Sequence, residues 1–151
     1  AIATSTYKLV IVGDLLSSKE NEYCLLKLGQ KRFICVGRVS NENLNLIYNS
    51  ACALLYPSFY EGFGLPPLEA MACGVPVISS NVTSIPEVCK NSAILIDPND
   101  IDELSYSMER VLTDSFLKLT MIERGLSTSN NYSWKNTALT TIKAYENIIR
   151  Y

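Results

Sequence analysis

Short apolar runs alternate along the chain with stretches in which apolar residues recur every three or four positions. Such runs are usual for strands buried in a parallel sheet. They cover residues 7–13, 33–37, 53–56, 75–79 and 93–96. The stretches between them have the 3.6-residue period of amphipathic helices. This alternation predicts one α/β domain over residues 1–151, with a single five-stranded, doubly wound, Rossmann-like parallel sheet and helices on both faces.

Capping residues mark the ends of several predicted helices. Ser17 and Glu20 have the spacing of a capping box, and Gly29 stands where a helix C-terminal glycine belongs. Asp100 and Glu103 repeat the capping-box spacing. Together with the periodicity, these signals predict helices that begin or lie at residues 17–28, 40–51, 67–73, 86–88, 100–112, 116–125 and 133–149. The last of these carries one apolar stripe, formed by Trp134, Ala138, Ile142, Tyr145 and Ile149.

Composition excludes several classes of function. Hydrophobic residues make up 48% of the chain and charged residues 19%, which favours a folded core over disorder. The net charge of −2 and the scattered basic residues give no basic stripe, so no nucleic-acid partner is expected. Because the chain has no histidine and its five cysteines form no C-x-x-C pair, it cannot build a classical zinc site or Ser-His or Cys-His catalytic machinery.

The same composition bears on localisation. Widely spaced cysteines are typical of reduced thiols in a cytoplasmic protein. Two N-x-S/T triplets, at Asn81 and Asn131, point the other way, although such triplets arise often by chance. No apolar run approaches the roughly 20 residues that a membrane-spanning helix needs. The sequence therefore predicts a cytoplasmic protein without a transmembrane segment.

The loop after the third apolar run combines two glycines, a helix start and two carboxylates. Ligands of open parallel sheets bind outside the carboxyl ends of the strands, where this loop lies. Gly62 and Gly64 let a ligand approach the main chain, and the helix that follows directs free amides and its positive dipole end to the same space. Glu61 precedes the glycines, and Glu69 is the charged residue of an otherwise apolar helix. Ligand hydroxyls could satisfy both carboxylates, but Glu61 could equally be an exposed loop residue and Glu69 could face water or cap a loop.

Glu61 and Glu69 form an E-x7-E motif, and residues 57–80 resemble the donor-site signature of family 4 glycosyltransferases. The resemblance continues in the same order through residues 9–13, 36–40, 84–88, 96–98 and 133–134. These retaining, metal-independent enzymes have the two-lobed GT-B architecture. The resemblance implies that the chain is the C-terminal, donor-binding lobe of a GT-B fold, lacking its first strand–helix unit.

The resemblance also implies a role for each residue of the motif. Glu61 would be the catalytic residue, beside the reacting carbon and in contact with hydroxyls of the transferred sugar. The backbone amides of Gly62–Leu65 would hold the sugar and the diphosphate, and Glu69 would accept hydrogen bonds from the ribose. The chain around Arg38 would line the base pocket. The implied donor-binding residues are Glu61, Gly62, Phe63, Gly64, Leu65, Glu69, Gly37, Arg38 and Val39.

The function implied by the resemblance is transfer of a hexose of the mannose, glucose or rhamnose class from a GDP- or UDP-linked donor, without cofactor or metal. The acceptor would be a glycan or a lipid-linked molecule in polysaccharide biosynthesis, bound through an N-terminal lobe. In its full-length form the cytoplasmic enzyme could associate peripherally with a membrane. Relatives carry an Arg and a Lys that grip the diphosphate, upstream of a strand like that at Tyr7, and residues 1–6 are too short to hold them. The isolated chain is therefore expected to be inactive.

Two other functions stay open on the sequence alone. One is a non-catalytic interaction or binding module that kept the fold, and the other is a nucleotide-sugar epimerase, which can share the GT-B architecture. Donor turnover once the missing residues are supplied would separate a transferase from a binding module. Release of epimerised sugar nucleotide would indicate an epimerase.

Overall fold

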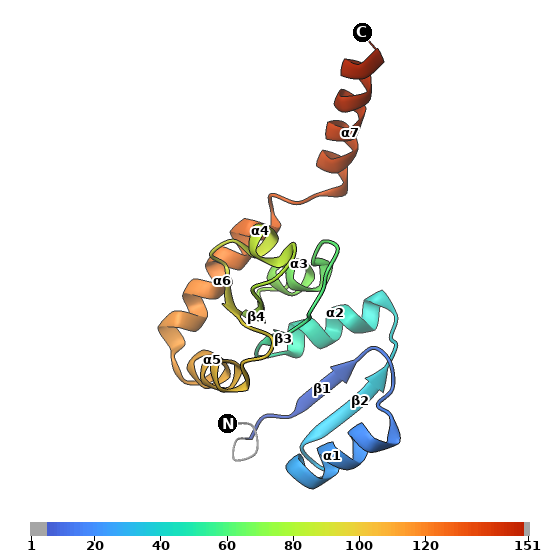
Figure 1. The fold of residues 1–151 in the computed structure, drawn as a ribbon. Helices are drawn as coiled ribbons and strands as arrows, with labels where there is room; N and C mark the ends of the chain where they lie inside the picture. The colour runs from blue at the N-terminus through green and yellow to red at the C-terminus, as the bar shows by residue number, and fades with distance from the viewer. Residues whose placement is uncertain (1–5, 150–151) are drawn as a thin grey trace. The chain divides into compact units, whose positions relative to one another are not determined.

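The structure is a computed structural model that describes residues 6–149. Its strands and helices follow one another in the order expected from the sequence, and every predicted strand and helix is present (Figure 1). They are β1 (Leu9–Val12), α1 (Ser18–Leu28), β2 (Phe33–Gly37), α2 (Asn41–Ser50), β3 (Leu54–Tyr56), α3 (Leu65–Ala72), β4 (Val77–Ser80), α4 (Ile85–Cys89), β5 (Ala93–Ile96), α5 (Ile101–Thr113), α6 (Ser115–Ser129) and α7 (Trp134–Ile149). The predicted α/β class with parallel strands is confirmed.

The strands pair as two parallel sheets. One sheet contains β1 and β2, and the other has the order β3-β4-β5. The chain divides accordingly into two compact units, Ala1–Ser50 and Ala51–Tyr151, here called the N-terminal and C-terminal units. The prediction of a single five-stranded sheet is therefore wrong, because the described strands form two sheets. The single sugar-nucleotide-binding domain over residues 1–151 stays a prediction. Strands that are consecutive in the sequence of a doubly wound fold need not be neighbours in its sheet, so apolar runs do not predict pairing.

Local signals set the ends of α1 in the N-terminal unit. The Ser17 amide donates to the Glu20 carboxylate over 2.8 Å, and the Glu20 amide donates to Ser17 Oγ over 3.3 Å, which confirms the predicted capping box. The helix ends at Gly29, whose φ of 77° lies in the left-handed region. The Gly29 amide donates to the carbonyl of Leu25, so the predicted C-terminal glycine is also confirmed.

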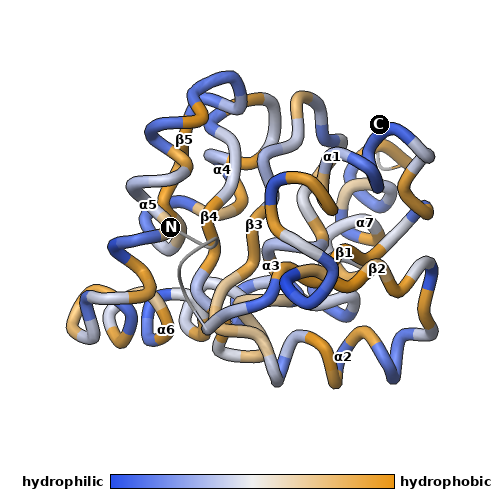
Figure 2. The backbone as a smooth tube through the Cα atoms, turned by 90° about the horizontal axis from the view of Figure 1, so that it is seen from below, coloured by the Kyte–Doolittle hydropathy of each residue, from blue (hydrophilic) through white to orange (hydrophobic). Residues whose placement is uncertain are grey.

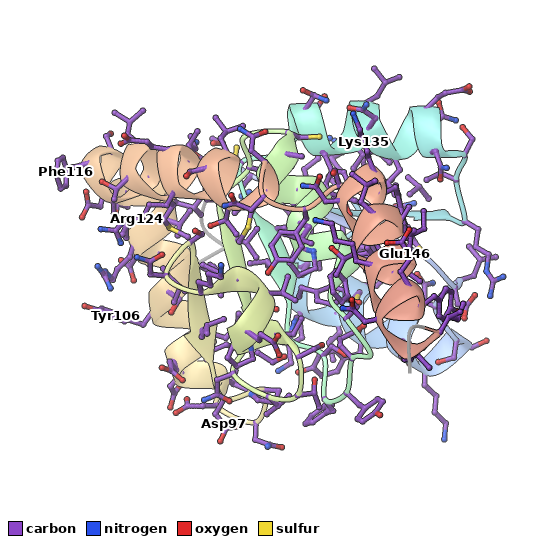
Figure 3. All side chains as sticks on the ribbon, turned by 90° about the horizontal axis from the view of Figure 1, so that it is seen from above. Asp97, Tyr106, Phe116, Arg124, Lys135 and Glu146 are labelled. Atoms are coloured by element: carbon purple, nitrogen blue, oxygen red, sulfur yellow. The ribbon has the colours of Figure 1, made fainter. Side chains whose placement is uncertain are left out.

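The core of the C-terminal unit lies between its sheet and the helices α5 and α6. Ile78, Ile96, Val111 and Met121 are buried together there. β5 is apolar along its length (Figure 2), whereas β4 is apolar at Val77 and Ile78 and ends with the buried Ser79 and Ser80. On the outer surface, Tyr106 of α5 and Phe116 of α6 project away from their helices and are largely exposed (Figure 3). This core holds the carboxyl ends of β3 and β4 in place.

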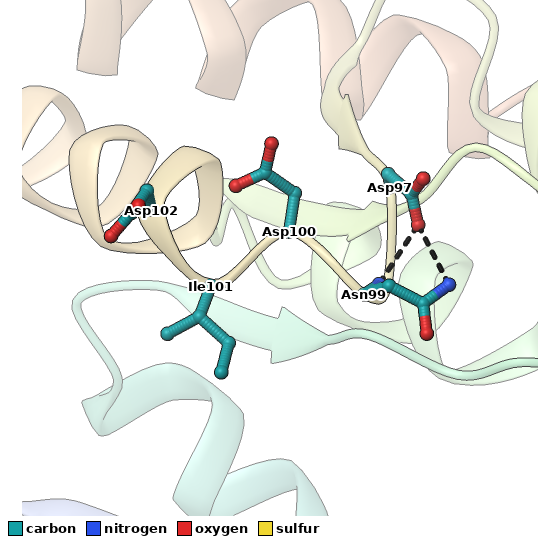
Figure 4. A pocket seen from close by; sticks show the side chains of 5 residues that line it. All are labelled: Asp97, Asn99, Asp100, Ile101 and Asp102. Atoms are coloured by element: carbon teal, nitrogen blue, oxygen red, sulfur yellow. Dashed lines mark hydrogen bonds between the residues drawn. The ribbon is translucent and has the colours of Figure 1, made fainter.

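The N-terminus of α5 differs in one detail from the expected capping box. Asp100 does cap the helix, because its Oδ1 accepts from the Glu103 amide over 2.8 Å. The Glu103 carboxylate, however, accepts from the amide of Asp97 over 3.0 Å, so the reciprocal bond of the capping box reaches three residues further back. Asp97 Oδ1 in turn accepts from the Asn99 amide and side chain (Figure 4). Two of the carboxylates that line the open hollow at residues 97–102, those of Asp97 and Asp100, thus stabilise a turn and a helix end.

The last helix, α7, is exposed throughout. None of its described residues is buried, and the side chains of its apolar stripe, Trp134, Ile142 and Tyr145 among them, are 80%, 51% and 63% exposed. Lys135 and Glu146 lie on the same helix (Figure 3). Among residues 6–149, no helix combines the length and the apolar character that crossing a bilayer requires.

Candidate functional site

The loop between β3 and α3 is fixed by a glycine that no other residue can replace without strain. β3 ends at Tyr56, Pro57 follows, and α3 begins at Leu65, directly after the glycine-containing turn. Gly64 is the N-cap residue of α3 and has a φ of 105°, in the region that disfavours L side chains. A Cβ atom at this position would lie 2.8 Å from Ile85 Cδ1. The backbone conformation therefore favours glycine here, and a Cβ atom would in addition force the buried Ile85 side chain of α4 to shift.

We expect Gly64→Ala to lower the free energy of unfolding by about 1–3 kcal/mol, because it adds a strained backbone to a steric clash. Equilibrium urea unfolding followed by circular dichroism measures the change. Gly62→Ala is the matched control, since a Cβ at Gly62 would meet no atom within 4 Å and its φ is not positive. Equal unfolding midpoints for the two variants would contradict this account of the turn.

Glu61 is held by three hydroxyl groups from different parts of the C-terminal unit. Its amide donates to Thr83 Oγ1 over 3.2 Å, and its carbonyl accepts from Ser84 Oγ over 3.1 Å. Its carboxylate Oε1 accepts from Tyr56 Oη over 2.5 Å. The main chain of Glu61 is thus tied to the segment between β4 and α4, and its side chain is tied to the end of β3.

The residues of this β4–α4 segment are themselves unusual. Thr83 has a φ of 54°, which is a strained conformation for a β-branched residue and one that concentrates at functional sites. Ser84 stands at the N-cap of α4 but makes no side-chain capping bond. Its hydroxyl instead donates to the carbonyl of Glu61. The conformations of Thr83 and Ser84 therefore place their hydroxyl groups where they hold the main chain of Glu61.

Besides burial, the negative charges of both predicted glutamates raise the pKa of the Tyr56 hydroxyl. The pKa of Tyr56 is raised well above its usual range, first by burial, then by its hydrogen bond to Glu61 and by the negative charges of Glu61 and Glu69. The pKa of the Cys73 thiol is raised by burial and by the charge of Glu69. Both carboxylates of the E-x7-E motif thus lie within electrostatic reach of the Tyr56 hydroxyl at the end of β3.

The turn of Gly62–Leu65 presents backbone amides beside Glu61. The first four N–H groups of a helix have no acceptor within that helix, and an anion placed near them gains about 0.3–1 kcal/mol. Pro66 and Pro67, in the first turn of α3, have no N–H group. The amides available at this end of α3 are therefore those of the turn itself, at the positions predicted to hold a diphosphate.

An aromatic contact anchors the same turn. The ring of Phe63 packs edge-on against the ring of Tyr132, which follows α6, with centroids 5.9 Å apart and an interplanar angle of 80°. The side chains of Phe63 and Leu65 each remain 45% exposed. Phe63 thus links the turn to the segment between α6 and α7 and keeps part of its ring exposed.

The residues predicted to line a base pocket lie in the N-terminal unit, at the end of β2. Gly37 is buried and has a φ of 70°. Arg38 pairs with Asp14, with Nη2 and Nε each 2.9 Å from Oδ1, and both side chains are more than 80% exposed. An exposed ion pair of this kind contributes little to stability. Since Gly37, Arg38 and Val39 belong to a different unit from Glu61 and Glu69, their role in one site stays a prediction.

Sequence reasoning missed Tyr56, Thr83 and Ser84. Tyr56 had one usable signal, because it places a hydroxyl at the end of an otherwise apolar strand. Thr83 had none, since a left-handed backbone is not expected of threonine.

In the described part of the chain, no three Cys, Asp or Glu side chains gather as a potential metal site. The metal independence implied by the resemblance stays a prediction.

Comparison with known proteins identifies the family. Residues 2–128 match the family described as glycosyl transferases group 1. The chain belongs to this family. It is 47% identical over 111 residues to the O-antigen chain mannosyltransferase B of Escherichia coli, a match that covers 74% of this chain and 29% of the relative. The chain therefore spans less than a third of that relative's length.

Solved structures confirm the predicted fold. The sucrose-phosphate synthase of Thermosynechococcus elongatus is 27% identical, with a TM-score of 0.84 over 95% of this chain and 39% of the synthase. The Anabaena protein HepE, solved in complex with UDP and glucose, has a TM-score of 0.79 at 19% identity, over 93% of this chain and 40% of that protein. The chain is thus part of a GT-B glycosyltransferase fold.

Proposed function

We propose that this chain is the donor-binding, C-terminal lobe of a retaining, metal-independent glycosyltransferase that transfers mannose or a related hexose to a glycan or lipid-linked acceptor. Membership of the glycosyl transferases group 1 and the similarity to an O-antigen mannosyltransferase support the reaction class. The observation that carries the proposal is the hydrogen bond of the Glu61 carboxylate to the Tyr56 hydroxyl, beside the Gly62–Leu65 amides and with the charge of Glu69 within electrostatic reach of that hydroxyl. This grouping combines hydroxyl-accepting carboxylates with an anion-binding turn.

Each part of this group matches one part of a sugar nucleotide. Ionised carboxylates accept hydrogen bonds from sugar hydroxyls, a role that suits Glu61 for the transferred sugar and Glu69 for the ribose. The amides of Gly62–Leu65 and the dipole of α3 suit the diphosphate. The site is built mainly from backbone and carboxylate groups, so it would recognise the donor by hydrogen bonding and would exclude bulk water only when a facing lobe covers it.

The identity of the nucleotide calls for a direct comparison. The E. coli relative is a mannosyltransferase, whereas HepE was solved with UDP and glucose. A binding panel of GDP, UDP, GDP-mannose and UDP-glucose distinguishes the bases and the sugars in one series. Release of an epimerised sugar nucleotide from any of these donors would instead support the epimerase alternative.

We expect the 151-residue chain to bind its preferred nucleoside diphosphate with the same affinity in the presence of magnesium and of a chelator. The reason is that amides and a helix dipole, and not a divalent ion, would neutralise the diphosphate at Gly62–Leu65. Isothermal titration calorimetry measures the affinity, and a thermal-shift assay checks it, because a ligand at a hundred times its Kd stabilises the fold by about 2.7 kcal/mol. Binding that requires magnesium would contradict metal independence.

The same titration includes a variant of the proposed ribose site. Hydrogen bonds to a charged group contribute about 1.5–3 kcal/mol, so Glu69→Ala should weaken binding at least roughly tenfold. Glu123→Ala is the matched control, because Glu123 is an exposed helical carboxylate on α6. Equal loss in both variants, or no loss in either, would show that the nucleotide binds elsewhere.

A further inference from the structure

We propose that Tyr56 is a positioning residue for Glu61: its hydroxyl fixes one oxygen of the Glu61 carboxylate and leaves the other oxygen to receive a hydroxyl of the donor sugar. The proposal rests on the proposed function, because it takes Glu61 to face the sugar. It assigns to Tyr56 a role that the E-x7-E motif does not contain, since Tyr56 lies in the strand before the motif.

The Tyr56 side chain projects from a fixed point of the sheet. Tyr56 is the last residue of β3 and pairs in register with Ser79 of β4. Its carbonyl accepts from the Ser79 hydroxyl over 2.9 Å, so the strand end is held by a side chain as well as by the ladder. Ser79 itself is fully buried. The Tyr56 hydroxyl therefore donates to Glu61 from a strand end whose backbone is held by β4 and does not move with the loop.

The hydrogen bond between them selects one orientation of the carboxylate. Tyr56 Oη donates to Glu61 Oε1 over 2.5 Å, and Tyr56 is the hydrogen-bond partner of this carboxylate within the described residues of the C-terminal unit. The bonds that Thr83 and Ser84 make with Glu61 reach its main chain only. Without the Tyr56 hydroxyl, the loop would still hold the backbone of Glu61, but its side-chain torsions would be free to vary.

Tyr56 stays protonated and can therefore always donate its hydrogen bond to Glu61. Burial, the hydrogen bond and the two carboxylates all raise the pKa of the phenol, so the proton stays on Tyr56 throughout the pH range in which enzymes are assayed. Because the phenol donates to Oε1, the Glu61 carboxylate keeps Oε2 as an acceptor. A carboxylate held in this way meets a sugar hydroxyl in one orientation, which is the condition for an ordered donor complex.

The test compares a nucleoside diphosphate with the matching sugar nucleotide, bound to the 151-residue chain. Tyr56→Phe and Glu61→Gln should leave the affinity for the nucleoside diphosphate unchanged, which also shows that each variant folds. Each should weaken binding of the sugar nucleotide roughly tenfold. The double variant should lose no more than the single Glu61→Gln variant, since residues that act through one contact are not additive. Tyr106→Phe, on the exposed surface of α5, is the matched control.

The outcomes separate this inference from the proposed function. If the unaltered chain binds neither ligand, the proposed function fails. If both ligands bind and Tyr56→Phe binds the sugar nucleotide as tightly as the unaltered chain does, the positioning role is wrong and the proposed function stands. Fully additive losses in the double variant would also overturn the positioning role.

A second measurement tests the contact without any ligand. Proton NMR of the unaltered chain should show a slowly exchanging, downfield hydroxyl resonance, assigned to Tyr56 by its loss in Tyr56→Phe. The resonance should move upfield in Glu61→Gln, because the acceptor loses its charge, and should stay in place in Tyr106→Phe. If no such resonance appears, or if Glu61→Gln leaves it unmoved, the Tyr56–Glu61 contact does not form in solution and the inference is refuted.

Discussion

Changing Glu61 to glutamine is expected to lower sugar transfer by about two to three orders of magnitude in an enzyme that joins this chain to an acceptor-binding lobe. Glutamine keeps the size of the side chain and one hydrogen-bond acceptor, but it removes the negative charge beside the reacting carbon. Groups aimed at the charge that develops in a transition state often supply the largest catalytic contribution. The loss should therefore appear chiefly in kcat, with the donor KM raised roughly tenfold by weaker binding of the sugar nucleotide, while the affinity for the nucleoside diphosphate stays the same.

Initial rates at saturating acceptor, with the donor concentration varied, separate kcat from KM. Glu123→Gln on α6 is the control for a charge change at an exposed site outside the motif. A Glu61→Gln enzyme with full kcat would remove the catalytic role from Glu61. A variant that loses nucleoside diphosphate binding as well would indicate that the substitution disturbs the Gly62–Leu65 turn and not the chemistry alone.

The elements of the fold follow from local signals in the sequence. The capping box at Ser17 and the glycine at 29 set the ends of α1, and each apolar run forms a strand. Strand pairing depends on contacts between distant residues, which is why the division into a two-stranded and a three-stranded sheet was not predicted. The Glu103 carboxylate illustrates the same limit on a smaller scale, since spacing alone did not show that it would bond to Asp97 in place of Asp100.

The candidate site divides in the same way between local and distant information. Glu61, Glu69 and the turn between them lie within nine residues of one another, so one stretch of sequence suggests them together. The hydroxyls that hold Glu61 in place include those of Thr83 and Ser84, which are separated from it by 22 and 23 positions. Their contribution depends on how β4 and α4 pack beside β3. No pattern in the sequence fixes that packing.

The exposed apolar stripe of α7 shows where periodicity stops being informative. The stripe was predicted correctly as a helical pattern, and Trp134 and Ile149 at its two ends are both about 80% exposed. A helical period tells which residues share a face, but it does not identify what covers that face. The same holds for the site, where the motif indicates a ligand class and leaves the sugar and the acceptor to experiment.

The 151-residue chain alone is expected to bind the donor and to transfer no sugar to an acceptor. Transfer needs donor and acceptor held in register, and orientation of two reactants can supply about 7–11 kcal/mol of the barrier. The groups gathered around Glu61 form a surface for one substrate. The chain spans 29% of the E. coli mannosyltransferase and 39% of the sucrose-phosphate synthase that it resembles, so a large part of those proteins has no counterpart in it.

The assay compares the isolated chain with the same chain joined to an acceptor-binding lobe, each with and without Glu61→Gln. A loss of 7–11 kcal/mol corresponds to a rate roughly five to eight orders of magnitude lower, so the isolated chain should show no acceptor product above background. Nucleoside diphosphate binding by calorimetry, measured in parallel, shows that the inactive protein is folded and loaded. Acceptor glycosylation by the isolated chain that Glu61→Gln abolishes would refute this prediction, because it would mean that the donor surface alone can orient both substrates.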